Sequence, residues 1–127
     1  MKQIVNTESG TGQVGNFNLG TTNGELVFTA GQVPETEGGE VLNDAPIKQQ
    51  TDQCLENLKA VLESEGLTLE HILKTTVYVV DIQNWEMVNE AYGEHFQELP
   101  ARTTVGVTGL WGGVDVEIEA VATTELE

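Results

Sequence analysis

The stretch Val114–Thr123, VDVEIEAVAT, alternates apolar and acidic side chains down to Glu119 and stays apolar at every second position through Ala122. A β-strand points successive side chains to opposite faces of a sheet, so its valines, isoleucine and alanines share one face. Asp115, Glu117 and Glu119 share the other face, each about 7 Å from the next. Solvent exposure explains Asp115 well, but it explains the two mid-strand glutamates less well. The stretch therefore predicts a strand with one buried face and one acidic face.

The other apolar segments predict the further strands of the sheet. Leu73–Val80, LKTTVYVV, is rich in β-branched residues and is typical of a central strand. Arg102–Val107 predicts a further strand. Phe17–Thr22 and Glu25–Thr29 flank Asn23-Gly24, the dipeptide preferred in two-residue type I′ turns, in which both central residues have positive φ. These two segments predict a β-hairpin near the start of the chain.

Two helices are indicated between the strands. The first has Asp44 as a candidate cap, Pro46 in its first turn and Gly66 as its stop. Its predicted buried stripe is Ile47, Thr51, Cys54, Leu55, Leu58, Val61 and Leu62. The second follows Asp81 or Asn84 as a cap. Its predicted buried face is Trp85, Val88, Ala91, Tyr92 and Phe96. The order of elements predicts an α+β protein with one sheet and both helices on the same face.

The charge of the chain is strongly unbalanced. Its 127 residues carry 21 Asp and Glu against 5 Lys and Arg, a net charge of -16, yet 39% are hydrophobic. We expect one domain over residues 1–127, because that apolar content suffices for a core. The acids are spread along the chain, which favours adaptation to salt, where the Debye length falls to about 3 Å at 1 M, over a basic partner. So negative a surface argues against nucleic-acid binding.

Targeting and metal-binding patterns do not occur in the sequence. Residues 1–10 lack the apolar core of a signal peptide, and no run of about 18 apolar residues exists, so we expect a cytoplasmic protein without membrane contact. Cys54 is the single cysteine, which excludes an internal disulfide and a cysteine-based zinc site. On its helical stripe it is more typical of a small buried hydrophobe than of a nucleophile. His71 and His95 do not have metal-ligand spacing.

Arg102 is the only arginine of this acid-rich chain. A guanidinium is a planar fork that grips a carboxylate through two parallel hydrogen bonds, which lysine cannot do. Two interpretations are open on spacing alone. Arg102 binds an anionic ligand, or it pairs internally with Glu117 or Glu119.

Five segments of the chain resemble the RidA (YjgF, L-PSP) family. The C-terminal signature of that family is similar to PARTTV at 100–105 followed by EIEA at 117–120. The likeness extends through FTAGQVP at 28–34, KTTVYVV at 74–80 and VNEAY at 88–92. It covers nearly the whole chain without a large insertion.

The resemblance implies a fold, an assembly and an activity. The fold is α+β, with a single mixed sheet of about six strands like that of chorismate mutase, and the assembly is a homotrimer with clefts between subunits. The activity is that of a 2-iminobutanoate/2-iminopropanoate deaminase, which hydrolyses enamine and imine acids such as 2-aminoacrylate to 2-keto acids and ammonia. The family needs no metal or organic cofactor.

The resemblance also implies roles for individual residues. The carboxylate-binding arginine of the family falls on Arg102, and its water-activating glutamate falls on Glu117. Further substrate contacts fall on the backbone of Gly31 and on Asn89. Glu119 raises the pKa of Glu117 if it lies nearby, whereas Arg102 lowers it, and the sequence leaves open which prevails.

Three positions depart from the family pattern. Phe17 replaces a tyrosine and keeps the aromatic wall of the substrate site without its hydroxyl. Ala30 replaces a serine. Thr104 replaces a cysteine and still offers a hydroxyl and backbone groups to the substrate.

These departures leave alternatives to the enzyme open. The missing hydroxyls favour a non-catalytic binder of small carboxylate metabolites in the same cleft. The labels of nuclease and translation inhibitor, which the family has carried, conflict with the negative charge. For the trimer, we expect apolar residues on the sheet face away from the helices, among them some of Val77, Val79, Val105 and Val107, to be covered by a partner.

Overall fold

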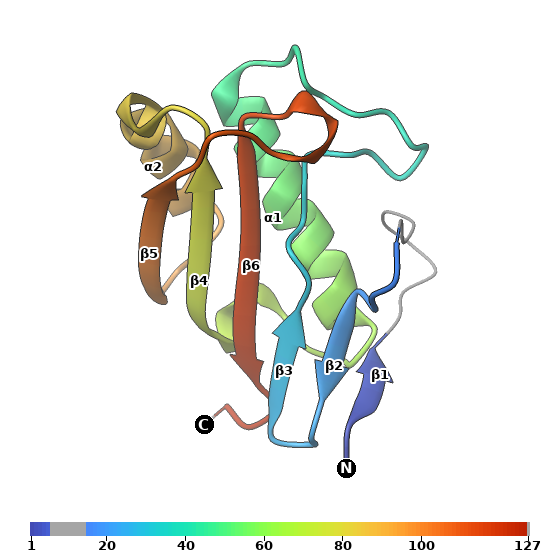
Figure 1. Cartoon of the computed structure of the whole chain (residues 1–127). Coiled ribbons are helices and arrows are strands. Elements are labelled where there is room, and N and C mark those ends of the chain that lie inside the picture. The colour runs from blue at the N-terminus through green and yellow to red at the C-terminus, as the bar shows by residue number, and fades with distance from the viewer. Residues whose placement is uncertain (6–14, 127) are drawn as a thin grey trace.

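A computed structural model describes residues 1–5 and 15–126, in which one six-stranded sheet carries two helices (Figure 1). The strands are β1 (Gln3–Val5), β2 (Gly20–Thr22), β3 (Leu26–Thr29), β4 (Ile72–Val79), β5 (Ala101–Gly106) and β6 (Val116–Thr123). The helices are α1 (Ile47–Glu63) and α2 (Trp85–Gly93), with short 3₁₀ turns at Leu69–His71, Ile82–Asn84 and Trp111–Gly113. The described helices are not long and apolar enough to cross a membrane.

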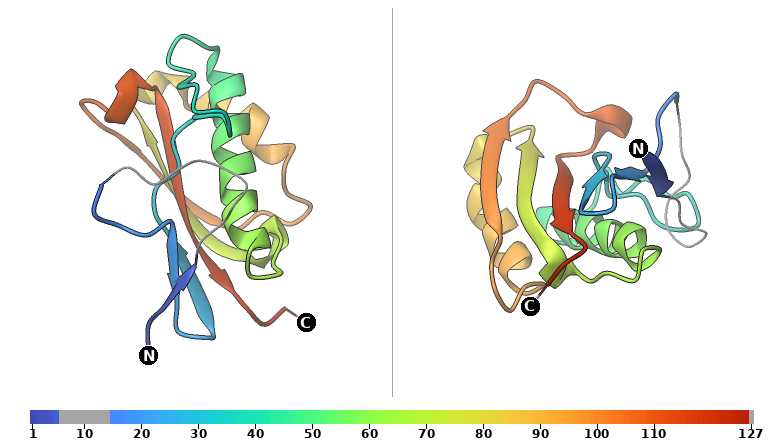
Figure 2. Two further views of the ribbon diagram at one scale, coloured as in Figure 1. Left: turned by 90° about the vertical axis from the view of Figure 1, so that its right-hand side faces the viewer. Right: turned by 90° about the horizontal axis from the view of Figure 1, so that it is seen from below.

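The sheet has the strand order β1-β2-β3-β6-β4-β5. Only β4 and β5 are parallel, and the other neighbouring strands are antiparallel. Both helices lie on the same side of the sheet (Figure 2). The expected single mixed sheet of about six strands with two helices on one face is therefore confirmed.

Strand β6 lies in the middle of the sheet, between β3 and β4. Its apolar positions Val116, Ile118, Ala120 and Ala122 are buried under the helices, as the alternation predicts. The intervening positions, Glu117 and Glu119 among them, point to the opposite side, which we call the open face. The central strand thus carries the core on one side and acidic groups on the other.

Helix α1 buries the predicted stripe, with Ile47 only partly buried at its start. Gly66, with φ 74°, ends the helix in a Schellman arrangement, in which the Leu67 N–H donates to the Leu62 carbonyl and the Gly66 N–H to that of Glu63. The expected cap at Asp44 is wrong. The helix begins one residue after Pro46, so Asp44 lies too far upstream to reach its first free N–H groups.

The hairpin between β2 and β3 is confirmed, but its turn is not of type I′. Thr22 and Val27 form the last pair, which leaves a four-residue loop, and Gly24 has a positive φ of 97° whereas Asn23 does not. The Asn23 Oδ1 accepts the N–H groups of Glu25 and Leu26, both at 2.9 Å. Because the Asn23 side chain satisfies these amides, the residue does not need the left-handed conformation.

The second helix is correct in type but differs in its buried face. Val88, Ala91 and Tyr92 are buried in α2, and Phe96 is buried just after it, yet Trp85 is 46% exposed. Helical Cα–Cβ bonds tilt toward the N-terminus, so this first-turn side chain extends beyond the packed part of the helix. Asp81 caps the preceding 3₁₀ turn through the Gln83 N–H.

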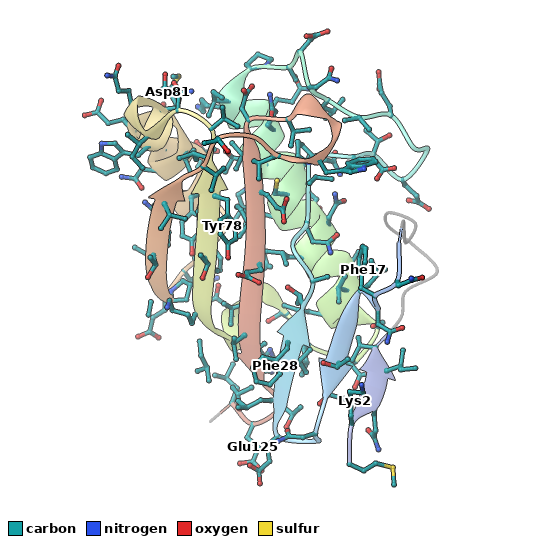
Figure 3. The ribbon with its side chains drawn as sticks, in the orientation of Figure 1. Lys2, Phe17, Phe28, Tyr78, Asp81 and Glu125 are labelled. Atoms are coloured by element: carbon teal, nitrogen blue, oxygen red, sulfur yellow. The ribbon has the colours of Figure 1, made fainter. Side chains whose placement is uncertain are left out.

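Of the four valines among which we expected apolar residues of the open face, Val77 and Val79 do not lie there. Both are buried beneath the helices, because they alternate in phase with buried Thr75. The open face instead carries Phe28 and Tyr78, which Figure 3 shows on the side of the sheet away from α1. Phe28 is 47% exposed and Leu73 is 50% exposed. Val105 of β5 is also exposed, and Val107 is half-buried.

Candidate functional site

Arg102 lies on β5, the edge strand, and its side chain points to the helix side of the sheet. Its register partner on β4 is Thr75, which is buried beneath the helices. The Arg102 Nη2 donates to Asn89 Oδ1, and the guanidinium carbon lies 4.8 Å from the centre of the Tyr92 ring. Both contacts come from α2, so this helix fixes the direction of the guanidinium.

Arg102 forms no ion pair with any carboxylate in residues 1–5 and 15–126. Internal pairing with Glu117 or Glu119 is therefore not the arrangement of the chain. The reason is topological, since those glutamates occupy the open face and Arg102 the other face. One positive charge thus remains available to an anion in a chain of net charge -16.

Glu117 lies on the open face of β6, opposite Tyr78 of β4. Its carboxylate packs directly against Gly31, where a Cβ would lie 2.0 Å from Glu117 Oε2. Burial raises the pKa of the Glu117 carboxyl, and the charge of Glu119 raises it further. The sequence left open whether Glu119 or Arg102 has the larger effect on the pKa of Glu117. Glu119 has the larger effect, because Arg102 is on the far side of the sheet.

Glu119 accepts a hydrogen bond from the Tyr78 hydroxyl. This bond, above all, raises the pKa of Tyr78. Asp115, the third carboxylate expected on this face, lies just before β6 and is not in open solvent as expected. It is half-buried, and its Oδ2 accepts from Gln50 Nε2 of α1 at 2.9 Å, while its own N–H donates to Gln50 Oε1 at 2.9 Å.

The structure brings the predicted site residues together in two groups. Arg102 and Asn89 contact each other, and Thr104 lies two residues further along β5, half-buried and opposite Val77. Glu117 and Gly31 form the second group, on the other face. Phe17 lies in the segment before β2 and is 43% exposed, and Ala30 is half-buried.

Two aromatic residues beside these groups were missed as site candidates. Tyr92 was assigned to the core alone, but its ring also lies under Arg102, and its hydroxyl bonds the Thr75 Oγ1 at 2.7 Å. Tyr78 was assigned to a strand without a role. Alternation places Tyr78 on one face of its strand, but its position against Glu117 and Glu119 depends on the register between β4 and β6.

No group of three or more His, Cys, Asp or Glu side chains in the described part of the chain is arranged to hold a metal ion. The chemistry that these residues offer is anion binding by the Arg102 group and proton transfer by the Glu117 group.

A family model described as endoribonuclease L-PSP matches residues 8–124. The chain belongs to the RidA (YjgF, L-PSP) family. A RutC family protein of Pyrococcus horikoshii is 40% identical to this RidA-family chain, over 98% of the chain and 100% of that protein. The 2-iminobutanoate/2-iminopropanoate deaminase of Salmonella typhimurium is 38% identical, over 96% and 98%.

Solved structures of the RidA family have the same fold. The crystal structure of Escherichia coli TdcF with bound serine matches with a TM-score of 0.90 at 34% identity, over 97% of this chain and 99% of that one. The YjgF gene product of E. coli matches with a TM-score of 0.90 at 36% identity, over 97% and 99%. The resemblance found in the sequence is confirmed for the family and for the fold of the chain.

Proposed function

We propose that this RidA-family protein is a deaminase that hydrolyses 2-imino and enamine acids, such as 2-aminoacrylate, to 2-keto acids and ammonia. The observation that carries the proposal is the single arginine, held by α2 and left without a carboxylate partner among the described residues. A guanidinium in this state is suited to a small carboxylate ligand. The Salmonella relative named as a deaminase supports this choice of substrate class.

We further propose that the active site forms between subunits of a homotrimer. Within one chain Arg102 and Glu117 lie on opposite faces of the sheet, so one substrate cannot contact both from the same subunit. A ring in which the β5 edge of one subunit lies beside the open face of the next brings the two residues together. The exposed Phe28, Leu73 and Val105 of that open face favour such a covering partner.

The proposed reaction needs few groups. Protonation of the enamine at its terminal carbon gives the 2-imino acid, whose carboxylate Arg102 holds through two N–H groups. Glu117 takes a proton from water as the water oxygen bonds to C2 and the C=N electron pair moves to nitrogen. Glu117 then returns that proton to nitrogen, which gives the carbinolamine. Glu117 next passes the hydroxyl proton of the carbinolamine to nitrogen as the C–N bond breaks, the C=O bond forms and ammonia leaves. In sum, imino acid and water give keto acid and ammonia, without oxidation or reduction.

The environment of Glu117 fits this double task. A group that accepts and then returns a proton works best when its pKa lies near the working pH. Burial and the charge of Glu119 both raise the pKa of Glu117 in that direction. Gly31 leaves the space that the carboxylate occupies.

The second candidate is a non-catalytic binder of small carboxylate metabolites. Two observations favour it: Phe17 and Ala30 lack the hydroxyls found in the family, and TdcF of E. coli has been crystallised with bound serine. In this case Arg102 binds the ligand and Glu117 performs no chemistry.

Turnover by arginine variants distinguishes these candidates. We expect the wild-type protein, in high salt, to release keto acid and ammonia from freshly generated 2-iminobutyrate. Arg102→Ala removes the carboxylate fork and lowers kcat/KM about 100-fold. Arg102→Lys, the matched control, keeps the charge without the fork and loses about tenfold, mainly through KM.

Equal rates for wild type and Arg102→Ala would contradict the deaminase. Arg102-dependent binding of 2-ketobutyrate without turnover, measured by calorimetry, would select the binder instead.

A further inference from the structure

Three ionisable side chains meet on the open face, where β4 and β6 are paired. Tyr78 of β4 lies opposite Glu117 in the strand register, and its hydroxyl donates to Glu119, two residues further along β6. Figure 3 shows Tyr78 on this face, between β4 and β6. The proposed reaction uses Glu117 and leaves Tyr78 and Glu119 without a role.

We propose that Tyr78 is a positioning residue that assigns the exchangeable proton of the two glutamates to Glu117 by holding Glu119 in its ionised form. The catalytic consequence rests on the deaminase proposed above. The assignment of the proton itself is a property of the free protein.

The geometry gives the two carboxylates unequal surroundings. Side chains two residues apart on one strand face lie about 7 Å apart, close enough for one negative charge to disfavour the other. The proton then resides on the carboxylate that is less well stabilised as an anion. Glu119 accepts the phenol, whereas among the described residues no hydrogen bond is donated to the carboxylate of Glu117, which packs against Gly31.

The shifts of the neighbouring groups agree with this assignment. The pKa of Glu117 is raised by burial and by Glu119, so Glu117 keeps its proton to higher pH than an ordinary glutamate. The hydrogen bond to Glu119 raises the pKa of Tyr78, so the phenol stays protonated and remains a donor. The pair therefore keeps its polarity over the pH range in which Glu117 titrates.

Few other charges face the cluster from the described elements around it. Lys74 of β4 is exposed on the same face, and Asp115, just before β6, is engaged by Gln50. Cys54 of α1 lies beneath, and burial raises the pKa of its thiol, with Glu117 raising it further, so it stays neutral. On the open face, β3 carries Phe28 and β5 carries only the uncharged residues Ala101, Thr103 and Val105.

Carbon-13 NMR titration of the glutamate carboxyl groups tests the assignment without any substrate. In the wild type we expect the Glu117 carbon to report the raised pKa of Glu117. Tyr78→Phe removes only the hydroxyl, so the carboxylate of Glu119 loses its hydrogen-bond donor. The exchangeable proton is then shared between the two carboxyl groups, and half-protonation of Glu117 shifts to lower pH.

A double-mutant cycle supplies the matched control. Glu119→Gln removes the neighbouring charge, so half-protonation of Glu117 again shifts to lower pH. Adding Tyr78→Phe to Glu119→Gln should then change nothing further at Glu117. An unchanged Glu117 titration in Tyr78→Phe overturns the proposal, and so does an equal shift in both backgrounds.

The pH profile of turnover gives a second readout that a merely structural tyrosine would not move. Glu117 acts as the base in its ionised form, so activity is lost as the pH falls through its pKa. In Tyr78→Phe this acid limb should move to lower pH, and kcat should fall about threefold to tenfold because the base is weaker, with KM changed less than about twofold.

If the acid limb of Tyr78→Phe lies at the same pH as that of the wild type, the catalytic part of the proposal is wrong. If the wild-type protein shows no turnover, the deaminase has failed, and the NMR titration still decides the role of Tyr78.

Discussion

The position of Glu117 depends on the absence of a side chain at residue 31. A Cβ there would lie 2.0 Å from Glu117 Oε2 and 2.9 Å from the carboxyl carbon. The φ of Gly31 is not positive, so an unusual backbone conformation does not require glycine at this position. Glycine is required because the Glu117 carboxylate occupies the space of a side chain. Gly31 and Glu117 therefore act as one unit, in which the backbone at Gly31 leaves room for the Glu117 carboxylate.

Gly31→Ala should separate activity from stability. The new methyl group displaces the end of a flexible side chain, so we expect Tm to change by no more than a few degrees. The displaced carboxylate loses its alignment with the substrate, and kcat/KM should fall about tenfold or more. Activity with 2-iminobutyrate and thermal unfolding measure the two effects.

Gly93→Ala, at the exposed end of α2, is the matched control, because its Cβ would have no atom within 4 Å. This variant should keep full activity. If Gly31→Ala is as active as Gly93→Ala, the role given to the Gly31–Glu117 contact is wrong.

At the scale of the elements, α1 positions the start of β6 through a buried glutamine. Gln50 is fully buried, and its Nε2 donates to the Ala45 carbonyl and to Asp115 Oδ2, both at 2.9 Å. Its Oε1 accepts the Asp115 N–H at 2.9 Å. One side chain thus ties the loop before α1 to the strand that carries Glu117.

Gln50→Ala should lower the free energy of unfolding by about 2 kcal/mol, because it removes three hydrogen bonds and leaves buried groups unsatisfied. Gln49→Ala is the control, because Gln49 precedes Gln50 on the same helix and its side chain is exposed. Denaturant unfolding of both variants gives the comparison. Equal stabilities for the two would show that the Gln50 bridge does not stabilise the fold.

The elements could be predicted from the sequence where one strong pattern determines them. The three- and four-residue spacing of α1 and the alternation of β6 match the structure within two residues at each end. The turn at Asn23 could not be predicted, because the asparagine side chain competes with the turn conformation that the dipeptide otherwise favours. Strand β1, only three residues long, has no pattern that distinguishes it.

Alternation alone predicts two faces for a strand but does not say which one the helices cover. For this reason the sequence could not show that the helices cover Val77 and Val79. The site residues could likewise be predicted only in part from local patterns. Arg102 and Glu117 could be singled out by residue type and by family resemblance, whereas Tyr78 depends on the β4–β6 register, which no local pattern contains.

At the scale of the whole molecule, the sheet separates the two residues that the proposed reaction needs. With β6 in the centre and β5 at the edge, Glu117 faces the open side and Arg102 the helix side. A site that uses both requires a second copy of the chain. The net charge of -16 gives such an assembly strong self-repulsion, so we expect it to form best in high salt, where these charges are screened.

The most direct test of this account uses two variants that lose activity for different reasons. Arg102→Ala and Glu117→Gln each lack one half of every site. If each site takes Arg102 from one subunit and Glu117 from its neighbour, random mixed trimers leave about one site in four intact. Co-expression of the two variants should therefore restore about a quarter of the wild-type deaminase activity, while each variant alone stays about 100-fold or more below the wild type. Mass spectrometry verifies that mixed trimers have formed. If these trimers are no more active than the two single variants, the claim that each site is shared between two subunits is wrong.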